Sequence, residues 1–293
     1  MASMRDIKRR KGSIQSTQQI TKAMKLVSTV KLQRAKANAE SSKTYFHAMY
    51  ETINSILKKS SFIDHKYLKS GENGRKAVVV ITSNRGLAGG YNSNVVKLIT
   101  KSEFADEDLA IYAIGKKGKE ALGRKYDIVQ DYSDMIEEPV YAEAMKISQQ
   151  LLSDFEEGLI SEIYLAYTGF KNTVSHIPTM LQLLPVDISK NSEDGAEEGS
   201  KEDSTDDNTL MNFEPNEIDA LDMLIPKYIT SLIYGAMIEA VASENGARMQ
   251  AMDSATSNAE EMIEDLTLKY NRARQGSITQ ELTEIIAGAN AIS

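Results

Sequence analysis

The sequence predicts a two-helix coiled coil with a small α/β domain inserted between its helices. The helices come from the two ends of the chain and run antiparallel, and the inserted domain has a mostly parallel sheet. Three observations support this fold class: no glycine or proline occurs between Gly12 and Gly71, apolar residues repeat at spacings of 3 and 4 after Pro226, and β-rich runs alternate with helical ones in between. The expected regions are an N-terminal helix (1–70), an α/β domain (71–189), an acidic disordered insert (190–212) and a C-terminal helix (213–293).

The N-terminal helix is expected to cover most of residues 13–70, which are rich in the helix formers Ala, Lys, Gln, Glu, Met and Leu. At a rise of about 1.5 Å per residue it would be roughly 60 to 80 Å long, more than the width of a small domain. The first half carries a thin apolar stripe composed of Ile7, Ile14, Ile20, Met24 and Val27. Such a stripe is too narrow to anchor the helix in a conventional core.

The middle of the chain alternates between strand and helix patterns, which indicates parallel βαβ units joined by crossover helices. Strands are expected at 76–82, 109–114, 126–130, 162–167 and 180–186. Helices are expected at 92–101, 116–125 and 140–157. The last strand leads into the acidic insert, and Pro215 and Pro226 mark the return to helix.

The C-terminal helix carries a repeat that is close to the seam of a coiled coil. The repeat consists of Met252, Ala255, Ala259, Met262, Leu266, Tyr270 and Ala273. Because acidic residues flank this repeat and basic residues fill the N-terminal helix, the two helices can pair with each other. The alternative, in which each helix packs separately on a globular domain, stays open on the pattern alone.

Composition excludes several classes of site. The 293 residues contain no cysteine, which rules out disulfides, zinc-cysteine sites and thiol nucleophiles, and the three histidines lie far apart in the sequence. We therefore expect no metal site. The sequence also shows no nucleophile elbow, no convincing carboxylate pair and no triad arrangement, so we expect no catalytic residue, and we expect no cofactor. No apolar run approaches the ~20 residues of a membrane span, and no signal peptide is recognisable, so a cytoplasmic location is expected.

Charge is distributed unevenly, although the net charge is only −8. Residues 1–36 hold ten basic side chains against the single acid Asp6, and residues 190–210 hold eight acids against Lys190 and Lys201. The basic end is suited to an anionic partner and the acidic stretch to a solvated insert. Nucleic acid is an unfavoured partner, because the nearby aromatics (Tyr45, Phe46 and Tyr50) lie outside the basic block.

A glycine-rich loop, SNRGLAGGYN at 83–92, follows an apolar strand and precedes a helix, the arrangement of a phosphate-binding loop. Gly86, Gly89 and Gly90 do not have the G-x-G-x-x-G spacing of a dinucleotide site, and no lysine followed by Ser or Thr completes a Walker A motif. We interpret the loop as a tight turn that packs the helix on the sheet. Some anion affinity stays possible, since Asn92 or Ser93 could cap the helix.

Four stretches together resemble one family, the gamma subunit of the F-type rotary ATP synthase, bacterial type. They are TQQITKAMKLVS at 17–28, the loop at 83–92, ARMQAM at 247–252 with ATSNA at 255–259, and NRARQGSITQELTEI at 271–285. The resemblance runs in order from residue 2 to the C-terminus. Two departures are Ala88, where many members carry cysteine, and the acidic stretch 191–208, which matches nothing in the family.

The resemblance implies an antiparallel coiled coil with a Rossmann-like domain at its base, acting as the central shaft of the motor. The implied partners are the alpha and beta subunits of the catalytic hexamer, the epsilon subunit and the c-subunit ring, with one copy of the chain per complex. The subunit itself would be non-catalytic and peripheral to the cytoplasmic face of the bacterial membrane. The alternative interpretation is a nucleotide-sensing α/β binding module with a dimerising coiled coil.

The resemblance also implies which residues contact loops of the catalytic subunits. By position these are Arg274, Gln275, Thr279 and Glu281, together with Arg9, Met24 and Lys25 on the facing helix. The competing interpretation for each is an exposed helix residue with no special role.

Overall fold

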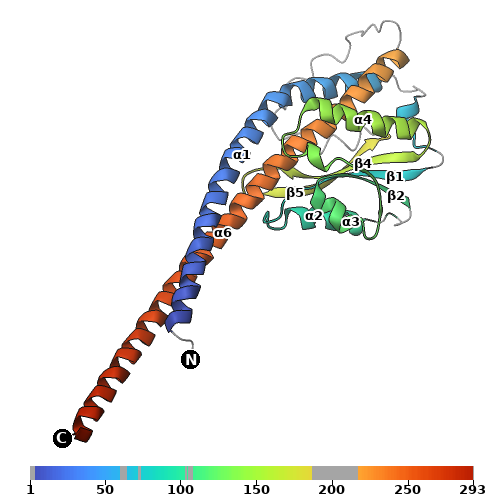
Figure 1. Ribbon diagram of the computed structural model, residues 1–293. Coiled ribbons are helices and arrows are strands. Elements are labelled where there is room, and N and C mark those ends of the chain that lie inside the picture. Colours follow the sequence, from blue (N-terminus) through green and yellow to red (C-terminus); the bar gives the residue numbers. More distant parts are fainter. Residues whose placement is uncertain are drawn as a thin grey trace. The chain divides into compact units, whose positions relative to one another are not determined.

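The computed structural model describes residues 4–59, 65–71, 74–102, 104, 108–186 and 217–292 (Figure 1). The acidic insert expected at 190–212 lies outside the described residues. The chain divides into two compact units. The coiled-coil unit combines residues 1–30 with 248–293, and the α/β unit comprises residues 31–247.

The α/β unit is built on one five-stranded sheet with strand order β3-β2-β1-β4-β5. The strands are β1 Arg75–Ile81, β2 Leu109–Ile114, β3 Asp127–Asp131, β4 Ile160–Phe170 and β5 His176–Leu184. The four strands β1 to β4 are parallel, whereas β5 pairs antiparallel with β4. Only residues 171–175 connect β4 to β5, which is too short for a crossover and forces a hairpin.

Helices cover both faces of this sheet. The α-helices are α2 Tyr91–Thr100, α3 Lys116–Leu122 and α4 Tyr141–Glu156, and two short 3-10 helices are η1 Lys66–Leu68 and η3 Ser133–Met135. The sheet has a hydrophobic core on each face. In one core α4 and part of α6 (Glu217–Ile292) pack on the sheet, and in the other α2 and α3 pack on the opposite face (Figure 1). All five strands and three helices expected in the middle of the chain are confirmed, with ends shifted by a few residues.

The central strand β1 shows why the pattern was readable from the sequence. Residues 77–81 are wholly buried, with Val79 and Ile81 in one core and Val78 and Val80 in the other. A strand buried on both faces reads as a continuous apolar run. Each such side chain contributes about 1.5–3 kcal/mol relative to exposure, so this strand is a main source of the unit's stability.

The coiled-coil unit contains the N-terminal part of α1 (Met4–Lys59) and the C-terminal part of α6. Cross-helix contacts fix the antiparallel pairing: Thr21 lies against Thr256, and Lys25 pairs with Asp253. The expected antiparallel coiled coil is therefore confirmed. Part of α6 is also long and apolar enough to cross a membrane, but 56% of that window is buried inside the protein, as in core helices.

The predicted seam residues need correction at three positions. Ile20 and Val27 of α1 and Met262 of α6 are all more than half exposed. A seven-residue repeat that begins at Ile7 continues through positions 11, 14, 18, 21, 25 and 28. All of these side chains are fully or partly buried in the structure. The prediction was wrong because it followed the apolar residues instead of the seven-residue period, and the inward positions of α1 include Lys11, Gln18, Thr21, Lys25 and Ser28.

The start of the first helix was also predicted too late. Helix α1 begins at Met4 and passes through Gly12, whereas the sequence suggested a start after that glycine. A Cβ at Gly12 would meet nothing within 4 Å, so this glycine makes no turn or close approach. One glycine costs a helix about 1 kcal/mol relative to alanine, which the packing of a long helix overcomes.

Candidate partner-binding surface

The seven residues expected to contact partners all lie in the coiled-coil unit. Arg274, Gln275, Thr279 and Glu281 are exposed on α6, and Arg9 is exposed on α1. Met24 and Lys25 are only partly exposed. The structure thus presents five of these side chains to solvent and buries the other two in part.

Lys25 already has a partner within the chain. Its Nζ lies 2.6 Å from Asp253 Oδ1, and its side chain is 40% exposed. Arg9, by contrast, makes a loose pair with Asp6 at 3.5 Å and keeps 85% of its side chain exposed. Arg9 is therefore free to change partners, whereas a partner of Lys25 must compete with Asp253.

The end of α6 carries an exposed apolar stripe that the sequence reasoning did not single out. Its members Ile278, Leu282, Ile285 and Ile286 are all exposed and recur at spacings of 4, 3 and 1. At about 100° per residue they occupy one face of the helix. Helical periodicity could have found this stripe, because it continues in α6 after the last seam residue.

The four expected contact residues of α6 frame this apolar stripe. Arg274 and Glu281 are seven residues apart and lie along one border, and Gln275 and Thr279 are four residues apart and lie along the other. Thr279 Oγ1 donates to the backbone oxygen of Gln275 at 2.9 Å. An apolar strip with polar borders is the usual composition of a protein-binding surface.

Pairing with α1 ends before this stripe begins. Thr21 opposes Thr256, so in an antiparallel pair Ile14 opposes Ile263 and Ile7 opposes Tyr270. By the same register Met4, the first described residue of α1, lies opposite residue 273. Residues 278–290 of α6 are exposed on nearly all sides, which leaves the stripe available to another protein.

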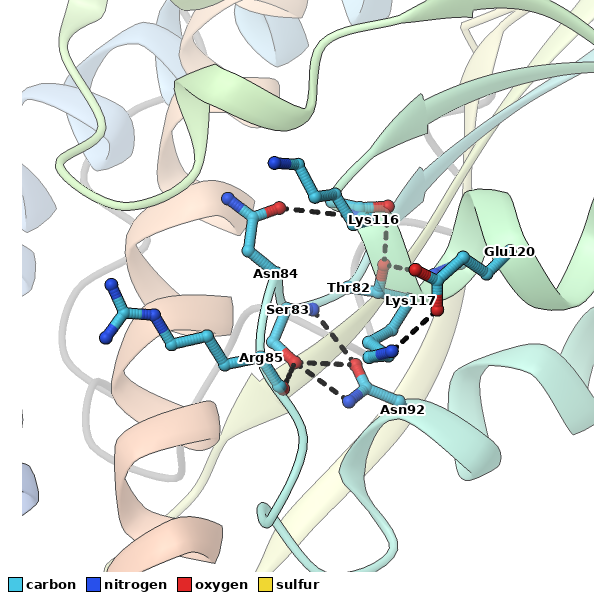
Figure 2. A network of polar contacts seen from close by, with 10 residues as sticks. Thr82, Ser83, Asn84, Arg85, Asn92, Lys116, Lys117 and Glu120 are labelled. Carbon is cyan, nitrogen blue, oxygen red and sulfur yellow. Dashed lines mark hydrogen bonds and ion pairs between the residues drawn. The ribbon is translucent and has the colours of Figure 1, made fainter. Parts of the chain in front are cut away.

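The glycine-rich loop forms a network of structural hydrogen bonds at the carboxyl ends of β1 and β2 (Figure 2). Lys116 N donates to Asn84 Oδ1 at 3.0 Å, and Gly118 N donates to Thr82 Oγ1 at 2.8 Å. Lys117 N donates to the backbone oxygen of Ser83 at 3.0 Å. The first three amides of α3 are thus already bonded to the loop, so they are not available to a phosphate.

The other helix beside the loop is capped differently from the expectation. The N-cap of α2 is Gly90, without a side-chain hydrogen bond. Asn92 instead turns back to the loop, where its Oδ1 accepts from Ser83 N at 2.9 Å (Figure 2). Neither Asn92 nor Ser93 is the N-cap, because Asn92 fixes the loop to the end of β1 and Ser93 Oγ donates to the Gly90 oxygen.

Glycine is required beside this network by close contact. Gly115 has a positive φ of 111°, and a Cβ there would lie 2.0 Å from the backbone oxygen of Thr82. A Cβ at Gly118 would lie 2.7 Å from Thr82 Oγ1. The interpretation as a tight turn that packs helices on the sheet therefore accounts for the loop and for the start of α3.

Two buried tyrosines of the α/β unit donate hydrogen bonds to carboxylates of the same unit. Tyr112 donates to Asp154, and burial together with this bond raises the pKa of the tyrosine. Burial, with a bond to Glu156, raises the pKa of Tyr67 to about 12. Among the described residues, no group of three or more His, Asp or Glu side chains could hold a metal ion. These contacts stabilise the fold, and we assign them no chemistry.

Similarity to known proteins extends over the whole chain. The family model described as ATP synthase matches residues 3–292. The ATP synthase gamma chain of Lachnoclostridium phytofermentans is 63% identical over 100% of both chains, and a sodium-ion-specific ATP synthase gamma chain of Acetobacterium woodii is 40% identical over 99% of both. A rotor chain of the Euglena gracilis mitochondrial ATP synthase shares the fold, with a TM-score of 0.61, 18% identity and coverage of 94% of this chain and 98% of that one. The chain therefore belongs to the ATP synthase gamma chain family.

Proposed function

We propose that this chain is the central shaft of an F-type ATP synthase and is itself non-catalytic. In this role it turns with the c-subunit ring as ions cross the membrane, and its rotation drives the catalytic hexamer through its binding states. The observation that carries the proposal is the exposed end of α6, where an apolar stripe is bordered by Arg274, Gln275, Thr279 and Glu281.

The surface of the coiled-coil unit is suited to a contact that must be exchanged during rotation. At the described end of α6 the exposed apolar side chains form one narrow strip. The exposed charges of this unit, such as Arg9, make surface ion pairs worth only about 0–1 kcal/mol each. Many weak contacts can break in turn, whereas a few strong ones would stop rotation.

The α/β unit is suited to be the rigid part of the chain that attaches the shaft to other subunits of the rotor. Its sheet is covered on both faces, and its loop network is closed by internal hydrogen bonds. We propose that this unit binds the epsilon subunit and the c-subunit ring, while the coiled-coil unit contacts the alpha and beta subunits. One copy per complex, peripheral to the cytoplasmic face of the bacterial membrane, follows from the same assignment.

Single-molecule rotation tests the proposal directly. Because the chain has no cysteine, Lys97→Cys introduces one exposed attachment point on α2 for a probe. In a complex immobilised through its catalytic hexamer, we expect ATP to drive rotation of the probe in one direction. A probe that stays fixed while the complex hydrolyses ATP would overturn the shaft assignment.

The isolated chain distinguishes the alternative function. A nucleotide-sensing module would bind ATP, ADP or NAD at micromolar concentration, and Gly90→Ala in the loop would abolish that binding. We expect calorimetry to detect no such binding, because the loop and the first amides of α3 satisfy each other. Purified alone, the chain is expected to hydrolyse no ATP.

A further inference from the structure

The seam of the coiled coil contains a polar layer, defined here as the cross-helix pairs Thr21–Thr256, Lys25–Asp253 and Gln18–Glu260. The two threonines are each 7% exposed, and their Oγ1 atoms lie 2.7 Å apart. In the two flanking pairs, Lys25 Nζ donates to Asp253 Oδ1 at 2.6 Å and Gln18 Nε2 donates to Glu260 Oε1 at 2.9 Å. Hydroxyls at this depth are uncommon in a coiled-coil seam, which is normally apolar.

The threonine pair makes its hydrogen bond between the helices only in the observed register. Besides facing each other, Thr21 Oγ1 lies 3.0 Å from the oxygen of Gln18, and Thr256 Oγ1 lies 2.8 Å from the oxygen of Met252. The two hydroxyls have one proton each, but there are three contacts: one between the threonines and one from each threonine to its own helix. One hydroxyl therefore donates to the other across the seam, and that other hydroxyl donates to its own helix. Separated threonines would keep the bonds to their own helices and lose the bond between helices.

The apolar seam residue Ile14 does not by itself select this register. The seam has a period of seven residues, so a shift of one helix by seven residues again brings the inward positions of the two helices opposite each other. Ile14, which opposes position 263 in the observed register, would then oppose Tyr270 or Thr256. Against Tyr270 the isoleucine would still have an apolar surface to pack on.

The polar layer distinguishes the registers clearly. After a shift of seven residues, Thr21 would face Ile263 in one direction or Met249 in the other. Lys25 would also lose Asp253, its partner at 2.6 Å. A shift therefore places a hydroxyl against an apolar side chain and moves Lys25 from Asp253 to Glu260 in the first direction or to Gly246 in the second.

We propose that the polar layer fixes the register of α1 against α6, so that the paired helices keep one alignment. A single polar position is known to specify register in coiled coils at some cost in stability. The inference goes beyond the shaft function and does not depend on it, since register is a property of the chain alone.

Spin-label distances in the full chain test the proposal. Gln15→Cys and Ser254→Cys provide two exposed label sites in a chain that has no cysteine. With the threonines intact we expect one distance. In T21V/T256V we expect a second distance population, because a slip of seven residues moves one helix along the other by about 10 Å, together with a higher thermal midpoint.

The matched control is T17V/T267V, in which each threonine hydroxyl bonds to the backbone of its own helix. This variant should keep a single distance, and so should T21S/T256S, which retains both seam hydroxyls. A single native distance in T21V/T256V would overturn the proposal. If the valine pair reduces helicity by circular dichroism, T21A/T256A removes the same hydroxyls and is measured in its place with the same two outcomes.

Discussion

At the scale of single residues, small polar side chains hold the α/β unit together at the glycine-rich loop of residues 83–92. Thr82 and Asn84 accept hydrogen bonds from amides of α3, and Asn92 accepts one from the loop itself. The sequence predicted a tight turn here, since the glycine spacing excluded nucleotide motifs. It could not predict which atoms bond, because these partners meet only when β1 and β2 lie side by side.

Gly115→Ala is expected to destabilise the α/β unit by about 3 kcal/mol or more. Its Cβ would overlap the backbone oxygen of Thr82, and alanine is strained at the φ of 111°. The matched control is Gly86→Ala in the same region, where a Cβ would meet nothing within 4 Å. Urea unfolding measures both variants, and equal midpoints would contradict the close-contact interpretation.

Glu156 is expected to make stability depend on pH. Hydrogen bonds from Lys66 and Tyr67 hold the pKa of this carboxyl below its ordinary value of 4.5. Since the folded pKa is depressed, the stabilisation is present above about pH 4.5 and is lost as the pH falls through the folded pKa. The side chain is 47% exposed, so the effect should stay below about 1 kcal/mol.

The measurement compares thermal midpoints of wild type and Glu156→Gln between pH 7 and pH 3. We expect the variant to be less stable at pH 7 and the difference to shrink below pH 4.5. Glu157→Gln removes the neighbouring carboxylate, which accepts from Ser153, and controls for the loss of one negative charge on the same helix end. A difference for Glu156→Gln that is constant with pH would refute this role.

At the scale of elements, the strands and helices of the middle region were predictable and the seam of the coiled coil was only partly so. Val78 to Ile81 form a continuous apolar run, which marks a strand covered on both faces. The seam of α1 instead uses Gln18, Thr21 and Ser28 at inward positions while Ile20 and Val27 face outward. Hydrophobicity alone cannot find a seam whose inward residues are polar.

Two glycines of α6 are expected to respond in opposite ways to alanine. Gly276→Ala should stabilise the chain by about 0.5–1 kcal/mol, because it is a helix interior position with nothing within 4 Å of the new Cβ. Gly246→Ala gains the same helix propensity but places its Cβ 2.5 Å from His176 Nε2. We expect a net loss of about 1 kcal/mol or more at this position.

Thermal unfolding of the two variants under identical conditions measures this contrast. His176→Ala combined with Gly246→Ala removes the overlap, so the double variant should recover part of the loss that Gly246→Ala causes alone. If both glycine variants stabilise the chain equally, His176 does not restrict α6 at residue 246.

At the scale of the whole molecule, the two units differ in how much of their side-chain surface they bury. The α/β unit buries two continuous cores, whereas the coiled-coil unit exposes most of its side chains and pairs through a narrow seam. The positive charge of residues 1–36 is likewise concentrated in one region of the chain. Under the proposed function both units contact partners, the α/β unit as a rigid body and the coiled-coil unit through its exposed side chains.

Arg274→Ala combined with Gln275→Ala is expected to weaken binding to the catalytic subunits by about tenfold, because two border contacts worth roughly 0.5–1 kcal/mol each are lost. The isolated chain should unfold at an unchanged temperature, since exposed helix substitutions cost under about 0.5 kcal/mol. The matched control is N271A/R272A, which also removes one amide and one cation from exposed positions of the same helix. Binding to the purified hexamer and ion pumping per ATP in the assembled complex measure the effect. Equal losses in both double variants would show that charge alone matters and that the borders of the apolar stripe are not the contact surface.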